Sequence, residues 1–378
     1  MKIAIVLNTS WNIYNFRMGL IRALIDDGHQ VYAVAPEDDF SRLLEQEGCI
    51  YQKVTMDSRG ASPLRDLGLI AELRKIYSRI RPDVVLHYTI KPNIYGTIAA
   101  ATLGIPAINN VSGLGTVFLK DNLVNRTAIT LYRAVFRLPR LVFFQNADDR
   151  DLFLKKKLVR EQITALLPGS GIDIGRFAYA PYQQKRPFTF LMVSRLIYDK
   201  GVSEYVEAAR ILKADGVDAR FQLLGAKDPV HKRGIPLDVV DEWIESGTIE
   251  YLGTTSDVRQ PVIDSDCIVL PSYREGTPRT LLEAASMGRA IVATNVPGCN
   301  NVVEDGVNGL LCEAKNVTAL ADAMRVMAQA DEELVRDMGC NGRKIVEQRF
   351  DEKIVINKYI NAIESCTTGA GRLTATEQ

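Results

Sequence analysis

Two carboxylates flank a helix start in the second half of the chain, in the segment EGTPRTLLE that runs from Glu275 to Glu283. We expect Thr277 to be the N-cap of a helix and Pro278 its first residue, where a missing N–H costs nothing. Free backbone amides at such a start, with the helix dipole behind them, suit a diphosphate. Glu275 can accept bonds from sugar hydroxyls and Glu283 from a vicinal pair such as those of a ribose. The spacing indicates a nucleotide-sugar site, and a capped helix with two solvated glutamates is the plainer alternative.

Two cations follow a different apolar run, in the segment SRLIYDKG. Arg195 and Lys200 lie between a predicted strand over 188–193 and a predicted helix over 203–213, which places them at the ligand edge of the same sheet. Fixed cations there can hold a diphosphate and stabilise the charge that grows on it as a glycosidic bond breaks. Surface cations in a loop are the alternative for this motif alone.

Short runs rich in Val and Ile alternate with amphipathic helical stretches along the chain. The strands and helices that this alternation predicts must position both motifs. The alternation predicts parallel sheets covered by helices on both faces, with ligands at the carboxyl ends of the strands. The predicted strands are 2–7, 30–35, 83–86, 105–109 and 140–144, and then 188–193, 220–224, 249–252, 267–270, 290–294 and 309–312.

The alternation is interrupted once, at the polar segment YAPYQQKRP over 179–187, which contains two prolines. Such a segment is typical of an interdomain linker. We therefore expect an α/β protein with two facing, Rossmann-like doubly wound domains and a cleft between them. The predicted parts are an N-terminal acceptor-side domain over 1–180, a linker over 181–187, a C-terminal nucleotide-sugar domain over 188–350, a helix over 351–366 that returns to the N-terminal domain, and a small, polar, disordered tail over 367–378.

Three segments of the second half carry a family resemblance: SRLIYDKGV, LPSYREGTPRTLLEAASMGRAIVAT and GCNNVVEDGVNGLL. They resemble the C-terminal domain of the retaining GT-B glycosyltransferases of family 4, the glycosyl transferases group 1 type, and the resemblance extends over nearly all of 1–366. In the first half, IYNFRMGLIRAL, KPNIYGTIAA and VSGLGTVF are similar to bacterial transferases that extend polyprenyl-diphosphate-linked sugars, among them N-acetylgalactosaminyltransferases. The resemblance implies the GT-B fold.

The resemblance also implies roles for matching residues. Arg195 and Lys200 would hold the donor diphosphate, and Glu275 would contact the transferred sugar. The family retains the anomeric configuration without a metal, the leaving diphosphate acts as the base, and UDP is the nucleotide usual for this branch. Further donor contacts are implied for Gly276, Thr277, Pro278, Thr280, Leu281 and Glu283, and for the base near Leu252.

The first half departs from the family pattern in two places. The loop over 8–15 lacks the Gly-Gly pair that many members carry. Where many members have a histidine that touches the sugar, this chain has the stretch HYTIK, so either His87 or Lys91 takes that place. We favour Lys91, because KPNIYG opens a helix that would face the cleft; a histidine held in the core is the alternative for His87. The acceptor or cleft candidates are Asn15, Arg17 (toward an acceptor diphosphate), Lys91, Gly113 and Gly115.

Metal and dinucleotide cofactors are not expected. Asp264 and Asp266 match the DxD pattern of metal-dependent transferases, but they lie where a helix ends and a strand begins, opposite the ligand edge, so we interpret them as a turn. The three histidines and six cysteines form no zinc-type cluster. GxGxxG follows neither domain's first strand, which argues against a dinucleotide oxidoreductase.

Charge is balanced overall, at 46 Lys and Arg against 46 Asp and Glu, which argues against a nucleic-acid binder. Residues 1–180 nevertheless hold 23 basic and 17 acidic residues. Within them, 119–141 is a basic amphipathic stretch with interleaved aromatics, which suits an anionic membrane surface; a core helix with a solvated basic face is the alternative. The first residues, MKIAIVLN, favour a buried strand over a signal segment, and no apolar run is long enough to span a bilayer. We expect a cytoplasmic protein, peripheral on the inner face of the cell membrane.

These observations predict a retaining, metal-independent glycosyltransferase. It would move a hexose or N-acetylhexosamine from a UDP-sugar to a polyprenyl-diphosphate-linked saccharide in bacterial surface-glycan or glycoprotein-glycan assembly. A GT-B transferase with a soluble acceptor and a UDP-sugar 2-epimerase are the alternatives, and the EGTPRTLLE loop with Arg195 and Lys200 favours transfer over epimerisation.

Overall fold

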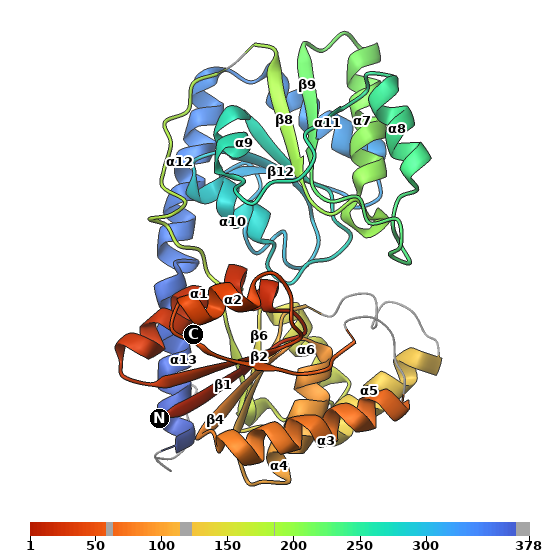
Figure 1. Cartoon of the computed structure of the whole chain (residues 1–378). Helices are drawn as coiled ribbons and strands as arrows, with labels where there is room; N and C mark the ends of the chain where they lie inside the picture. Colours follow the sequence, from red (N-terminus) through yellow and green to blue (C-terminus); the bar gives the residue numbers. More distant parts are fainter. Residues whose placement is uncertain (58–62, 114–122, 185, 368–378) are drawn as a thin grey trace. The chain divides into compact units, whose positions relative to one another are not determined.

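The computed structural model describes residues 1–57, 63–113, 123–184 and 186–367 (Figure 1). The chain divides into two compact units. The first comprises Met1–Ser170 and Glu352–Gln378, and the second comprises Gly171–Asp351. Each unit is a parallel sheet with helices on both faces, as the alternation of apolar runs and amphipathic stretches predicts.

The sheet of the first unit has seven parallel strands among the described residues, in the order β3-β2-β1-β4-β5-β6-β7. The central strands β1 and β4 are apolar and almost wholly buried, as strands covered on both faces must be. They pair so that Ile5 lies opposite Leu86. The strands are β1 (Lys2–Val6), β2 (Gln30–Ala35), β3 (Ile50–Lys53), β4 (Val84–Tyr88), β5 (Ala107–Val111), β6 (Leu141–Phe144) and β7 (Thr164–Leu166).

Helices cover both faces of this first sheet. One face packs against α1, α2 and α13, through a core that includes Ile5, Ile21 and Tyr359. The other face packs against the remaining helices, with Val85 and Phe144 turned toward them. The helices are α1 (Ser10–Asp26), α2 (Ser41–Gln46), α3 (Pro63–Ile80), the π-helical turn η1 (Pro92–Gly96), α4 (Thr97–Ala101), α5 (Leu123–Val135), α6 (Ala147–Lys155), the short η3 (Glu161–Ile163) and α13 (Glu352–Thr367).

The sheet of the second unit has six parallel strands in the order β10-β9-β8-β11-β12-β13. This is the strand order of a dinucleotide-type Rossmann fold, and it reverses direction between β8 and β11. The strands are β8 (Phe188–Val193), β9 (Ala219–Leu224), β10 (Glu250–Tyr251), β11 (Cys267–Leu270), β12 (Ala290–Thr294) and β13 (Gly309–Cys312).

The second sheet is also covered on both faces. Helices α7, α8 and α11 contribute to one core with Phe190 of β8, and α9 and α10 contribute to the other with Leu191. The last long helix of the unit, α12, contributes to both cores. The helices are the short η4 (Tyr198–Lys200), α7 (Val202–Ala214), α8 (Leu237–Glu245), α9 (Arg259–Asp264), α10 (Arg279–Ser286), α11 (Val317–Gln329) and α12 (Glu332–Arg349).

The predicted division at 180 and the predicted linker over 181–187 are wrong. The second unit begins at Gly171, because the segment after it packs on the second sheet. Ile172 and Phe177 lie in one core of that unit. Tyr182 is buried in the other core, and its hydroxyl donates to Asp266 at 2.9 Å. The polar residues and prolines therefore indicate a segment without regular secondary structure, but this segment is packed on the second unit and does not link the two units as a loose connection.

Candidate functional site

The loops after β8 and β11 meet at the point where the strand order of the second sheet reverses. That point is where open parallel sheets bind their ligands. The loop after β8 carries Arg195 and Lys200, and the loop after β11 carries Glu275. The two motifs predicted from the sequence are therefore brought to one place.

The ammonium group of Lys200 forms an ion pair with the carboxylate of Glu275. Their side chains are 25% and 13% exposed, so the pair is partly withdrawn from water yet still reachable by a ligand. The backbone N–H of Glu275 donates to the carbonyl oxygen of Pro297 at 3.1 Å, which fixes the loop beneath the carboxylate. The pair thus presents an oriented carboxylate and an oriented cation at the ligand edge.

Two glycines allow this close packing of loops. Gly201 has φ of +74°, and a Cβ there would overlap the backbone carbonyl of Pro271 in the neighbouring loop. Gly298 has φ of +91°, and its Cβ would lie 2.6 Å from the carbonyl oxygen of Glu275. Only glycine meets both conditions, because it has no Cβ and tolerates positive φ. Lys200 and Glu275 consequently sit on loops that touch backbone to backbone.

The start of helix α10 differs from the prediction. The helix begins at Arg279, and Pro278 is its N-cap with an extended ψ of 116°, so Thr277 lies one residue before the cap. The amide of Leu281 donates to the carbonyl of Pro278 at 3.1 Å. The Thr280 hydroxyl donates to the carbonyl of Val193 at 3.2 Å and ties the helix start to the end of β8. The predicted phosphate contact through the Leu281 amide would have to share that intrahelical bond.

Glu283 is not a solvated glutamate at a helix surface. Its side chain is 12% exposed, and Arg279 one turn earlier donates to it through Nε at 3.0 Å. Burial raises the pKa of Glu283, and the Arg279 cation opposes that rise. The second carboxylate of the motif is therefore buried with a cation against it, which argues against the plainer alternative.

The remaining donor-side candidates line the same edge. Arg195 is 56% exposed and lies 3.8 Å from Asp228. Leu252, which follows β10, is 41% exposed, and its amide donates to Leu223 at the end of β9 at 2.9 Å. An exposed apolar side chain beside strand ends is suited to lie against a flat base.

In the first unit, His87 and Lys91 have different environments. His87 is fully buried, and its ring nitrogens lie 2.9 Å from the Tyr77 hydroxyl and 3.0 Å from the Asn109 side-chain oxygen. Burial lowers its pKa to about 4, so the ring is neutral. Lys91 lies beyond the end of β4 and pairs with Asp66 at 3.0 Å. His87 is a core residue, which leaves Lys91 as the candidate for substrate contact.

The other first-unit candidates lie on α1 and after β5. Arg17 is 6% exposed, and its guanidinium lies 4.3 Å from the ring centre of Tyr88. Its Nε is buried and has no hydrogen-bond partner among the described residues, and the contact with an acceptor diphosphate stays a prediction. The Asn15 amide donates to the Trp11 carbonyl at 2.9 Å, within helix α1. Gly113 follows β5 with φ of +125°, and Gly115 lies outside the described residues.

The DxD pattern has a structural explanation. Asp266 is fully buried and accepts bonds from the Thr189 amide at 2.7 Å and the Tyr182 hydroxyl at 2.9 Å. It thus ties the start of β11 to the start of β8, as the turn interpretation requires. Among the described residues, His, Cys, Asp and Glu form no group of three or more that could hold a metal ion.

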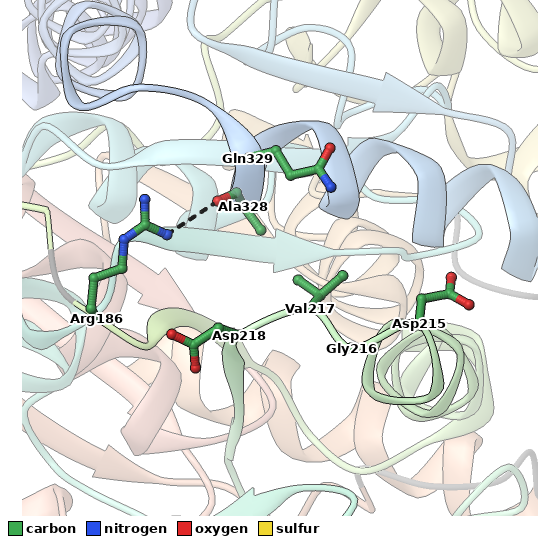
Figure 2. A pocket seen from close by; sticks show the side chains of 7 residues that line it. All are labelled: Arg186, Asp215, Gly216, Val217, Asp218, Ala328 and Gln329. Atoms are coloured by element: carbon green, nitrogen blue, oxygen red, sulfur yellow. Dashed lines mark hydrogen bonds between the residues drawn. The ribbon is translucent and has the colours of Figure 1, made fainter.

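A pocket of about 330 Å³ lies at the opposite edge of the second sheet, among the segments that precede its strands. Figure 2 shows Arg186 reaching across it to the carbonyl of Ala328, at 3.5 Å. Asp218, which also lines the pocket, comes directly before β9. The pocket therefore lies away from the switch-point loops and is not part of the candidate site.

The basic stretch over 119–141 is only partly described, with side chains from Ile129 onward. Its aromatics point inward: Tyr132 and Phe136 are buried and stack edge to face, 4.7 Å apart. Arg133 and Arg137 are exposed. The inward aromatics favour the core-helix alternative for this part, and the exposed arginines leave a solvated basic face. Within the described part of the chain, no helix is both long and apolar enough to span a bilayer.

Sequence reasoning missed three partners of the site: Asp228, Arg279 and Asp66. Arg279 could have been found, because a cation four residues before a glutamate on a helix forms a pair. Asp66 lies 25 positions from Lys91, and Asp228 lies on another loop, so only the fold brings these pairs together.

The fold is that of an α/β protein with two Rossmann-like units, a class that binds its ligands at the switch point of each sheet. Residues 2–146 match the family Glycosyl transferase 4-like, and residues 187–330 match the family Glycosyl transferases group 1. The chain therefore belongs to the GT-B glycosyltransferases of family 4, and it is a glycosyltransferase.

Three similar proteins illustrate the match. The N,N'-diacetylbacillosaminyl-diphospho-undecaprenol alpha-1,3-N-acetylgalactosaminyltransferase of Campylobacter jejuni is 28% identical over 95% of this chain and 97% of its own length. The UDP-Gal:alpha-D-GlcNAc-diphosphoundecaprenol alpha-1,3-galactosyltransferase of Escherichia coli is 24% identical over 78% of each chain. The crystal structure of Anabaena HepE in complex with UDP superposes with a TM-score of 0.77, covering 97% of this chain and 100% of that chain at 21% identity.

Proposed function

We propose that this glycosyltransferase moves a hexose or N-acetylhexosamine from a UDP-sugar to a polyprenyl-diphosphate-linked saccharide in bacterial surface-glycan or glycoprotein-glycan assembly. The observation that carries the proposal is the Lys200–Glu275 pair at the switch point of the second sheet. The names of the Campylobacter and Escherichia relatives, both of which act on undecaprenyl-diphosphate-linked sugars, support the acceptor class.

In the proposed reaction, Arg195 and Lys200 bind the donor diphosphate, and the Glu275 carboxylate accepts hydrogen bonds from the transferred sugar. The bond from the anomeric carbon to the UDP oxygen breaks, and the electron pair leaves with UDP. An acceptor hydroxyl oxygen bonds the anomeric carbon on the same face and gives its proton to the leaving diphosphate, so the anomeric configuration is retained. The cations of Arg195 and Lys200 stabilise the growing negative charge, and the reaction is metal-independent.

The nucleotide end of the donor is assigned to the other residues of this edge. Glu283 accepts the two ribose hydroxyls, and Leu252 lies against the base. Gly276, Thr277, Pro278 and Thr280 line the loop and helix start between the two carboxylates. UDP is supported by the HepE complex, whose fold this chain shares.

A lipid-linked acceptor places the enzyme at a membrane, and we assign the contact to a basic surface of the first unit. Two hydrogen bonds show that its parts adjoin: Arg133 reaches the Lys156 carbonyl at 3.4 Å, and Arg160 reaches the Arg137 carbonyl at 3.5 Å. With exposed Lys155 and Lys157, these side chains suit the anionic inner face of the cell membrane. Replacing Lys155, Lys156 and Lys157 by Gln should weaken sedimentation with phosphatidylglycerol vesicles, whereas the same change at exposed Lys75, Lys232 and Lys344 should not.

The test of the proposed function is UDP release from a panel of UDP-sugars, with EDTA present, with and without a bacterial membrane lipid extract. Release from one UDP-sugar that depends on the extract supports the proposal. Release that needs only water-soluble saccharides indicates a soluble acceptor instead. Loss of release in EDTA contradicts metal independence.

A further inference from the structure

The backbone just after β4 in the first unit has an unusual conformation. It adjoins β1 at the switch point of its sheet, where ligands bind in this type of fold. Thr89, the next residue, has φ of +64°, which is costly for a β-branched side chain. Lys91 follows, and the π-helical turn η1 begins directly after it. Strained residues and π-helical turns persist mainly where function requires them.

Lys91 is held in this place by two residues. Its ammonium donates to Oδ1 of Asp66 at 3.0 Å, and the Tyr95 hydroxyl donates to Oδ2 of Asp66 at 2.9 Å. The side chains of Lys91 and Asp66 are 16% and 7% exposed. Burial and the nearby Asp66 carboxylate raise the pKa of Tyr95, so the phenol keeps its proton and acts as the donor. Both carboxylate oxygens of Asp66 thus accept a bond from a residue near the end of β4.

This pair is unlike one that serves stability or binds phosphate. A buried ion pair loses in desolvation much of what it gains in attraction, so apolar residues would stabilise the unit as well. At the donor edge the exposed Arg195 adds a second cation on the same loop as the Lys200–Glu275 pair, whereas at the end of β4 the Asp66 carboxylate offsets the charge of Lys91. An ammonium has three donors, and Asp66 takes one of them. Nearby, the Thr89 hydroxyl is buried and has no hydrogen-bond partner among the described residues.

We propose that Asp66, fixed by Tyr95, is a positioning residue that aims the Lys91 ammonium at a neutral oxygen of the saccharide substrate. The oxygen is a sugar hydroxyl or the carbonyl of an acetamido group. This inference rests on the proposed function and adds to it how the first unit recognises a sugar: through a charge-neutral donor set and not through a free cation.

The experiment measures initial rates and KM for donor and acceptor in four variants of the full chain: Asp66→Asn, Tyr95→Phe, Lys91→Met and the double variant of Asp66→Asn with Lys91→Met. Glu47→Gln, which breaks the exposed Arg22–Glu47 pair of the same unit, is the matched control. UDP affinity is measured by calorimetry for each variant, because UDP lacks both the transferred sugar and the acceptor saccharide. Thermal unfolding shows how much of each sample is folded.

Asp66→Asn and Lys91→Met should each lower kcat/KM about tenfold or more, the effect of losing or misdirecting one charge-assisted bond. Tyr95→Phe should have a smaller effect in the same direction, and UDP affinity and Glu47→Gln should be unchanged. Because Asp66 acts through Lys91, Asp66→Asn should cost little in the Lys91→Met background. A raised KM for one substrate identifies whether donor or acceptor carries the oxygen.

Additive losses in the double variant, or lower unfolding temperatures with normal rates per folded molecule, would overturn the inference, because Asp66 would then be a structural residue only. The proposed function fails separately, if the unchanged enzyme transfers no sugar from any UDP-sugar.

Discussion

The ammonium of Lys200 is bonded to the carboxylate of Glu275, although 75 positions separate them in the sequence. The pair exists because β8 and β11 are neighbours in the sheet and their loops touch at Gly201 and Pro271. A cation and a carboxylate are thereby fixed before any ligand arrives, which is the preorganisation that favours charge development in a transition state.

Glu275→Gln should lower the turnover number about 10² to 10³-fold, the usual cost of removing one group aimed at a transition state. The amide keeps the shape of the side chain, so UDP affinity and the unfolding temperature should change little. Steady-state UDP release and calorimetry measure the two effects. Glu304→Gln is the control, since it breaks an exposed ion pair with Arg349 in the same unit. Equal activity of both variants would show that Glu275 does not act on the sugar.

As the pH is lowered, donor binding should begin to weaken at a higher pH than it would if the pKa of Glu283 were that of an ordinary glutamate. Burial raises the pKa of Glu283, and the proposed contact with the ribose needs the carboxylate form. Because Arg279 opposes the rise, Arg279→Gln should raise the pKa of Glu283 further and move the acid limb of UDP binding to higher pH. Glu283→Gln should remove that limb. UDP calorimetry between pH 4.5 and 7.5 (about the range of interest for a carboxyl group of raised pKa) tests this, and an unmoved limb in Arg279→Gln would contradict it.

Gly201→Ala should damage both stability and donor binding. Its Cβ would overlap the Pro271 carbonyl, and its φ of +74° is unfavourable for alanine. Gly247 is the matched control, because it has φ of +65° but nothing within 4 Å of its Cβ position. Gly247→Ala should cost only about 1–2 kcal/mol, the price of left-handed backbone. Urea unfolding and UDP binding distinguish the two variants; equal losses would show that the loop contact at Gly201 is unimportant.

The first unit should lose stability on acidification because of His87. The unfolded ring takes up a proton below about pH 6.5, whereas burial lowers the folded pKa to about 4. The unfolded state therefore binds more protons in that window, and the stabilisation present at neutral pH falls by up to about 1.4 kcal/mol for each pH unit toward 4. An NMR titration that shows the His87 ring protonating near 6.5 in the folded protein would refute this.

Much of the fold could be predicted, because buried parallel strands are continuous apolar runs. All six strands of the second sheet lie in the predicted places, but β3 and β7 of the first were missed. Both end strands of that sheet are only partly buried, and β3 contains Gln52 and Lys53, so neither has the apolar signature. Their positions become evident only from pairing with β2 and β6.

The sequence predicted those residues of the candidate site that follow the end of a strand. Lys200 and Glu275 each follow an apolar run, and that position alone indicated a ligand role. Their mutual ion pair, and the pairing of Lys91 with Asp66, depend on which strands are neighbours and on the angle of each loop. The sequence left His87 and Lys91 as alternatives for the sugar contact. The structure favours Lys91, because His87 is fully buried in the core.

The most direct test of the central claim is the mass of a lipid-linked product. A defined undecaprenyl-diphosphate-linked saccharide is incubated with the enzyme and the UDP-sugar that gave UDP release, and the lipid is examined by mass spectrometry. The account predicts a product heavier by one hexose or one N-acetylhexosamine, formed in EDTA and nearly absent with Glu275→Gln. UDP release without any gain in lipid mass, or an equal gain with Glu275→Gln, would contradict it.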